Sequence, residues 1–170
     1  MKIVTSLLAL VGGCLFFLLF PLQICLSEEG RERESSFKEA VALFEQGDTD
    51  RAIEAMKKVV AADAGNAEAH DKLGYFFLKK GQYDDSMNAF AAALKINPAL
   101  RTSKTGMGLS LLKKGDMKGA ETILTEALSL NPYPSSAHYA LGLVYEKLND
   151  YEKAVSQFKE GIKTFKSGKK

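Results

Sequence analysis

The chain has 170 residues, of which 46% are apolar and 26% are charged, a composition that fits one ordinary globular domain with an additional segment. With 23 basic and 21 acidic residues the formal net charge is +2, so net charge supplies no field that would attract nucleic acid or acidic lipid. The only cysteines, Cys14 and Cys25, both precede residue 28, which excludes disulfides, a thiol nucleophile and thiolate metal sites from the rest of the chain.

Residues 1–27 predict export across a membrane or insertion into one. After Lys2 the segment carries no charge, and the run of residues 7–20 is almost wholly apolar. Three interpretations fit this layout: a secretory signal peptide cleaved after Ser27, an uncleaved membrane anchor, and a lipoprotein signal around Cys14. In each of them the rest of the chain lies on the extracytoplasmic side, in the periplasm or anchored to the membrane, and contacts the membrane only through this segment.

A pattern with a period of 34 residues follows a charged linker at residues 28–32. Within each period, apolar residues recur at helical spacing on both sides of a turn signal, which predicts two amphipathic helices. The period divides the chain into four units without an insertion: 33–66, 67–100, 101–134 and 135–168. Residues of one kind recur at this spacing, as in Gly74, Gly108 and Gly142, in Phe90, Leu124 and Phe158, and in Pro98 and Pro132.

The residue types at these positions indicate how the two helices of a unit pack. A glycine in the first helix allows a close approach, and a large apolar residue in the second helix fills the space beside it. One helix pair cannot bury its apolar stripe alone, whereas stacked units can. We therefore expect the four units to form one continuous stack.

Two local features predict departures from the regular pattern. Ser36 and Glu39 have the spacing of a capping box, so the first helix is expected to begin at Ser36. In the third unit, Gly106 is an additional glycine inside a helix, which predicts either a frayed helix or a hinge.

The repeated units resemble the tetratricopeptide repeat (TPR) family. The match is carried by Leu73-Gly74, Phe77, Phe90, Ala93, Pro98 and their equivalents. The resemblance implies an all-α, right-handed superhelical solenoid of four tandem helix-turn-helix repeats. It also implies that the first helices line a concave groove that binds a partner peptide or helix. The groove residues that it implies are Phe37, Val41, Phe44, Asp71, Tyr75, Leu78, Lys79, Leu109, Leu112, Lys113, Tyr139, Leu143 and Lys147.

The sequence predicts no catalytic residue, no metal site and no cofactor. The only histidines, His70 and His138, are separated by twice the period, which indicates a packing position. Residues 106–111 begin like a dinucleotide-binding loop but lack its third glycine and a preceding strand, and no nucleophile-elbow, zinc-protease or phosphate-loop motif occurs. Some TPR proteins clamp a carboxylate with basic and amide side chains, and only Lys72 matches that set. We therefore expect a protein that is not an enzyme.

Two functions fit these observations. The first is a non-catalytic protein–protein interaction scaffold in envelope assembly or transport, with Tyr75, Leu109 and Tyr139 as groove anchors and Lys79, Lys113 and Lys147 on the rim. The alternative is a structural protein that dimerises or polymerises through its last repeat, because no additional helix follows to cover the apolar side chains of residues 155, 158 and 162. The stems of Lys159, Lys163 and Lys166 would otherwise have to cover that face.

Overall fold

The computed structural model describes residues 30–129 and 134–168, and the part of the chain that it describes folds into eight α-helices without a strand. The helices are residues 30–45, α2 (Thr49–Ala62), α3 (Ala67–Lys80), α4 (Tyr83–Ile96), α5 (Arg101–Lys114), α6 (Met117–Ser129), α7 (Ser135–Lys147) and α8 (Tyr151–Ser167). The predicted fold class, an all-α solenoid of helix pairs, is confirmed.

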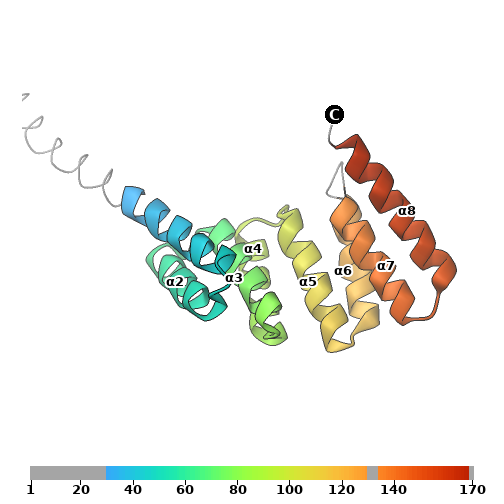
Figure 1. Cartoon of the computed structure of the whole chain (residues 1–170), viewed down its shortest axis with the longest axis horizontal. Helices are drawn as coiled ribbons and strands as arrows, with labels where there is room; N and C mark the ends of the chain where they lie inside the picture. Colours follow the sequence, from blue (N-terminus) through green and yellow to red (C-terminus); the bar gives the residue numbers. More distant parts are fainter. Residues whose placement is uncertain (1–29, 130–133, 169–170) are drawn as a thin grey trace, which may run out of the picture.

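The helices stack in chain order along the long axis of the molecule, from the first helix at one end to α8 at the other (Figure 1). From α2 to α8, each helix packs against the next one, and α5 also contacts both α3 and α7. The first helices of successive pairs therefore lie on one side of the stack and the second helices on the other, which is the arrangement of a solenoid.

Close packing within each pair depends on the recurring glycines, as expected. A Cβ atom built on Gly74 of α3 would lie 2.7 Å from Cδ1 of Phe90 in α4, and one on Gly108 of α5 would lie 2.5 Å from Cγ of Leu124 in α6. Gly142 stands in the same relation to Phe158. The ring or branched side chain thus occupies the volume that any larger residue would need.

The turns inside the pairs require a left-handed backbone. Gly47, Gly81 and Gly115 have φ values of 88°, 83° and 89°, and Asn149 occupies the equivalent place in the last pair with φ of 61°. Glycine adopts this conformation without strain, and asparagine tolerates it better than most other residues. All four helix pairs therefore turn in the same way.

Polar groups link neighbouring pairs inside the stack. The hydroxyl of Ser86 on α4 lies 2.7 Å from the carbonyl oxygen of Gly74 and 2.9 Å from the hydroxyl of Ser110 on α5. Ser110 also donates to the carbonyl oxygen of Gly106 over 3.0 Å. The two hydroxyls have two protons for these three contacts, so two of the three are hydrogen bonds at any moment, and polar as well as apolar contacts join the α3–α4 pair to α5.

The expected start of the first helix is wrong. The helix already includes residue 30, so Ser36 lies inside it and donates to the carbonyl oxygen of Glu32 over 2.9 Å. Lys38 forms an ion pair of 2.6 Å with Glu34 one turn earlier. Such pairs support a helix, and a serine hydroxyl can bond back to its own helix instead of capping it. Residues 30–32, predicted as linker, are consequently helical.

The expectation that the helix frays at Gly106 is also wrong, because α5 is a continuous helix and Gly106 is buried within it.

The predicted export segment, residues 1–27, lies outside the described residues. Within the described ranges, no helix combines the length and the apolarity that crossing a bilayer requires.

Candidate protein-binding groove

A depression of about 280 Å³ opens between the first helices of the second, third and fourth pairs. Its lining comes from α3, α4, α5 and α7 and consists of Asp71, Lys72, Tyr75, Leu78, Phe90, Thr102, Thr105, Gly106, Leu109 and Ser136. We call this site the α3–α5 depression. It lies on the side of the stack formed by the first helices, where the resemblance placed the groove.

Tyr75 is the most exposed large side chain of the α3–α5 depression, at 41%. Its ring packs edge-on against the ring of Phe44 in the first helix, with 5.5 Å between the two centroids. Nζ of Lys79 lies 5.3 Å from the centroid of the Tyr75 ring. Phe44 in turn stacks on the buried ring of Phe76 at 4.3 Å. Tyr75 is therefore a preorganised aromatic surface, held from below by a stack of two rings.

The polar end of the depression contains a largely buried carboxylate. Asp71 is 9% exposed, and its Oδ1 accepts a hydrogen bond of 2.6 Å from the hydroxyl of Ser103 on α5. The bond joins the second and third pairs. Thr102 and Thr105 of α5 add hydroxyl groups beside Asp71, so this end of the site can both accept and donate hydrogen bonds.

Gly106 opens the floor of the depression. A Cβ atom at this position would lie closer than 3.0 Å to Cζ of Phe90, so the buried ring of Phe90 forms the floor by occupying the space that a side chain at 106 would need. Sequence reasoning missed Phe90 and Gly106 as site residues. The available signal was the additional glycine itself, since the equivalent positions in the other units carry Lys38, Lys72 and Ala140.

The structure brings only some of the predicted groove residues together. Asp71, Tyr75, Leu78 and Leu109 line the α3–α5 depression. Phe37, Val41 and Phe44 instead pack on the core cluster of the first two pairs, and Leu112, which is buried, and Leu143 belong to the core cluster of the last two. Leu112 is therefore unavailable to a partner. Lys79, Lys113 and Lys147 are exposed, at the last turns of α3, α5 and α7.

Tyr139 lies elsewhere, at the C-terminal end of the stack. Its ring is 5.7 Å from that of Phe158 between centroids, in a depression between α7 and α8. The two histidines occupy equivalent places but differ in partners: His138 Nδ1 lies 2.8 Å from the amide oxygen of Gln157, and His70 Nε2 lies 3.3 Å from the carbonyl oxygen of Ala64. Both contacts are those of packing residues.

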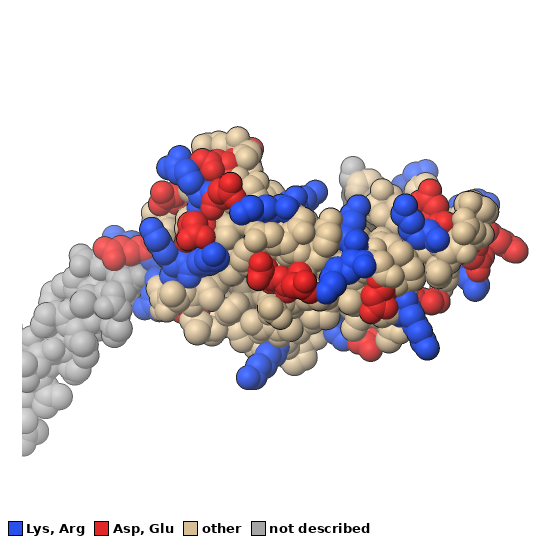
Figure 2. Space-filling model, turned by 90° about the horizontal axis from the view of Figure 1, so that it is seen from below, with Lys and Arg blue, Asp and Glu red and all other residues tan. Residues whose placement is uncertain are grey.

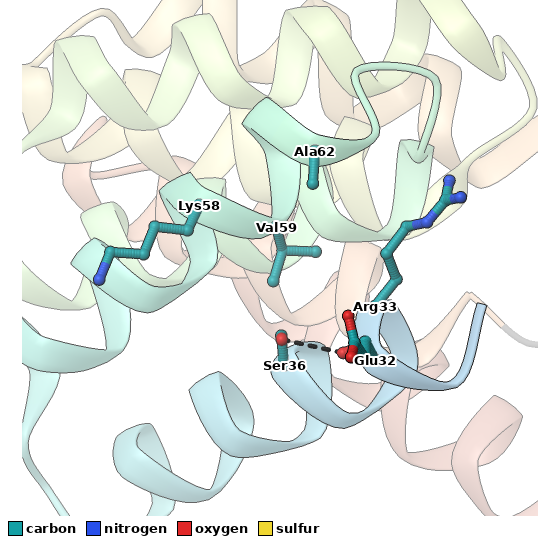
Figure 3. Close-up of a pocket in the computed structure, with 6 residues that line it drawn as sticks. All are labelled: Glu32, Arg33, Ser36, Lys58, Val59 and Ala62. Atoms are coloured by element: carbon teal, nitrogen blue, oxygen red, sulfur yellow. Dashed lines mark hydrogen bonds between the residues drawn. The ribbon is translucent and has the colours of Figure 1, made fainter. Parts of the chain in front are cut away.

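Another depression, of about 450 Å³, lies between the first helix and α2 (Figure 3). Its walls are the side chains of Glu32, Arg33, Ser36, Lys58, Val59 and Ala62. The charged ends of Arg33 and Lys58 extend to opposite sides of it, so they do not converge on a common point. In residues 30–129 and 134–168, no group of three His, Cys, Asp or Glu side chains is placed to hold a metal ion.

Charges of both signs are interspersed over the face of the molecule shown in Figure 2, with uncharged stretches between them. Ion pairs in the described part of the chain include Lys57 with Glu54 at 2.8 Å and Lys104 with Glu126 at 2.8 Å. This face therefore presents no extended field of one sign that would attract a polyanion.

The family model of the middle TPR-like domain of cilia and flagella-associated protein 70 matches residues 40–166. The chain therefore belongs to this TPR-like family. The match covers the four helix pairs except for residues 30–39 of the first helix and the last residue of α8.

Solved structures show the same fold. A crystal structure of MamA is 24% identical, covers 80% of each chain and has a TM-score of 0.70. MamA from Desulfovibrio magneticus RS-1 is 22% identical over 79% of this chain and 76% of its own, also with a TM-score of 0.70. TTC0263, a thermophilic TPR protein of Thermus thermophilus, is 20% identical in sequence. The match covers 78% of this chain and 74% of TTC0263, with a TM-score of 0.72. No curated protein sequence matches the chain.

Proposed function

We propose that this protein is a non-catalytic scaffold that binds a segment of a partner protein in the α3–α5 depression, on the extracytoplasmic side of a membrane. The observation that carries the proposal is the exposed ring of Tyr75 beside the partly exposed side chains of Leu78 and Leu109. Large apolar groups held in place on a concave surface are the usual anchors of protein–protein recognition.

The α3–α5 depression has about 280 Å³ and is open to solvent, whereas small-molecule sites usually bury most of the surface of their ligand. Its open shape therefore favours a peptide over a metabolite. A site of this size suits one large apolar side chain of an amphipathic helix or an extended peptide. The hydroxyls of Thr102 and Thr105 and the carboxylate of Asp71 would then meet polar groups beside that side chain.

The charges around the depression favour a partner with acidic residues next to its apolar anchor. Lys79 lies beside Tyr75, and Lys113 is exposed at the end of α5. Such rim charges contribute more to the association rate and to specificity than to affinity. We expect the partner segment to contain a large apolar residue with an aspartate or glutamate next to it.

Photo-crosslinking in the native cell tests the groove. A photoreactive phenylalanine analogue replaces Tyr75 in the full-length chain, and a matched chain carries it at Asn88, which is exposed on α4. We expect one discrete protein adduct from the probe at 75, which L109S in the same chain reduces at least fivefold, and no such adduct from 88. The same adduct from both positions, or one that L109S leaves unchanged, would contradict the proposal.

The location rests on the apolar run of residues 7–20 and on Lys2 before it. A membrane-impermeant thiol reagent tests it on S156C, since Ser156 is exposed on α8 and cysteines otherwise occur only before residue 28. Labelling from outside the cytoplasmic membrane of intact cells is expected. Labelling only after that membrane is broken would place the repeats in the cytoplasm.

A further inference from the structure

The last helix pair leaves a large apolar surface open. A depression of about 820 Å³ lies between α7 and α8, and its walls include Tyr139, Phe158, Ile162 and Phe165. The side chains of Tyr139, Ile162 and Phe165 are 58%, 57% and 54% exposed. The stems of the neighbouring lysines therefore do not cover this surface, which we call the C-terminal face.

Inside the stack, the following helix pair covers the central part of the equivalent surface. Asp71 and Thr105 occupy the place of Tyr139 in the second and third units, and each is 9% exposed. Phe90 and Leu124 occupy the place of Phe158, and both are fully buried. The C-terminal face is thus the surface on which a further helix would lie if the stack continued.

At two positions the C-terminal face is more apolar than the equivalent interior surface. Where the last unit has Tyr139 and Phe165, the second unit has the buried Asp71 and the exposed Asn97, whereas the residues equivalent to Phe158 and Ile162 are apolar in every unit. A surface selected to face water would show the opposite change at these positions, because exposed apolar patches promote association.

The apolar surface also ends at a definite place. Glu146 stands in α7 where the third unit has the buried Leu112. A complete further repeat would bury the carboxylate of this glutamate, which is unfavourable unless a basic group pairs with it. The C-terminal face therefore fits one helix laid along α8 better than a full additional helix pair.

The sequence of α8 matches a second copy of itself. Val155, Phe158, Ile162 and Phe165 follow one another at intervals of three and four residues, the spacing of a two-helix seam. Flanking this seam, Glu152, Lys159 and Lys166 recur every seven residues. In a parallel pair these charges would lie opposite Ala154 and Gly161, whereas an antiparallel pair places Glu152 near Lys166 of the partner subunit twice and Lys159 near its own copy.

We infer that the C-terminal face binds the C-terminal face of a second copy of this chain, with the two α8 helices antiparallel and the two-fold axis between Phe158 and Ile162. In this arrangement Val155 lies opposite Phe165 of the partner subunit, and the dipoles of the two helices oppose each other. The two depressions share Ser136, so the contact borders the α3–α5 depression, whose other lining residues lie outside the C-terminal face.

Cysteine crosslinking in cells distinguishes this arrangement from the others. One full-length chain carries E152C and a second carries K166C, and each has a different epitope tag. The two chains are expressed together and also separately, and the cells are oxidised briefly. The unsubstituted chain shows the background from Cys14 and Cys25, and peptide mapping identifies the linked positions. K153C is the matched control, because Lys153 lies over the ring of Tyr145 and so points away from the seam.

A disulfide between E152C of one chain and K166C of the other is the expected product, with little linkage of either variant to itself and none from K153C. Adding I162E to both chains should lower the mixed product at least tenfold. Because Ile162 is more than half exposed, the helix content measured by circular dichroism should remain unchanged. Linkage of each variant to itself, linkage to a different protein, no linkage at all, or a mixed product that I162E leaves intact would overturn the inference.

Discussion

The ring of Phe90 lies directly beneath Gly106, on the neighbouring helix pair, and no Cβ atom fits between the two residues. The same ring also packs on Gly74 of its own pair, through Cδ1, Cε1 and Cγ. Phe90 is therefore both the main filler of the second pair and the floor of the α3–α5 depression. Two glycines on different helices make this double role possible.

G106A should destabilise the protein although alanine is the better helix former. Alanine at a helix interior is favoured over glycine by about 1 kcal/mol, but inserting a methyl group into a packed interface costs about 1–3 kcal/mol. We expect a lower urea midpoint for G106A, with an unchanged slope. F90L shortens the side chain at the point of contact, so G106A should cost less in the F90L background than in the native chain. An increase in stability from G106A alone would show that the ring has room to move.

S103A should lower the free energy of unfolding by about 1–3 kcal/mol, the usual cost of leaving a buried polar group without its partner. The substitution removes the donor to Asp71 and adds no strain, because Ala69 and Ala137 occupy the equivalent positions of the neighbouring units. Urea unfolding measures the loss. D71T brings in the residue of the next unit, and in its background S103A should be nearly neutral. An equal loss in both backgrounds would mean that the hydrogen bond contributes nothing.

Tyr145 should make stability fall with rising pH in the alkaline range. Burial, together with its hydrogen bond of 2.7 Å to Glu121 and the negative charge of that carboxylate, raises the pKa of Tyr145 from 10.0 to about 12. The folded protein therefore holds this proton more tightly than the unfolded chain does, so the stabilisation is complete below pH 10 and is lost as pH rises towards 12.

Y145F tests this dependence. Phenylalanine is the residue that the second unit carries at the equivalent position, Phe77, so the ring should be accommodated. The difference in free energy of unfolding between the native chain and Y145F should shrink as the pH rises from 10 to about 12. A difference that stays constant would mean that Tyr145 titrates equally in both states.

N66A should cost about 1 kcal/mol, the typical effect of removing a helix N-cap. The side chain of Asn66 accepts a hydrogen bond of 2.9 Å from the backbone N–H of Ala69 in the first turn of α3. N66D keeps an acceptor at this place and should retain most of the stability in thermal or urea unfolding. A loss from N66D as large as that from N66A would mean that the bond is not the source of the effect.

How far the fold could be predicted follows from where each interaction lies in the chain. Gly74 and Phe90 belong to one unit, and the same pairing recurs at Gly108 with Leu124, so a simple offset of the sequence reveals it. The turn glycines recur in the same way. The start of the first helix could not be predicted so well, because the ion pair of Glu34 with Lys38 extends it past the capping signal at Ser36.

The candidate site depended more on tertiary structure. Tyr75, Leu78 and Leu109 were predicted and do line one depression, but Leu112, only three residues beyond Leu109, is buried. Helical spacing shows which residues share a side of a helix. It does not show how much of that side the neighbouring helices cover, because this depends on the distance and angle at which helices from other units pack.

The sequence alone was sufficient to determine the repeat, the helix pairs and the glycines that allow them to pack, because these features arise from contacts within one period of the chain. Only the tertiary structure decided which positions remain open. Asp71 and Tyr139 occupy the same place in their units, yet the first is 9% exposed and the second 58%. The difference is physical: a following helix pair covers Asp71, and in the described part of the chain no further pair covers Tyr139.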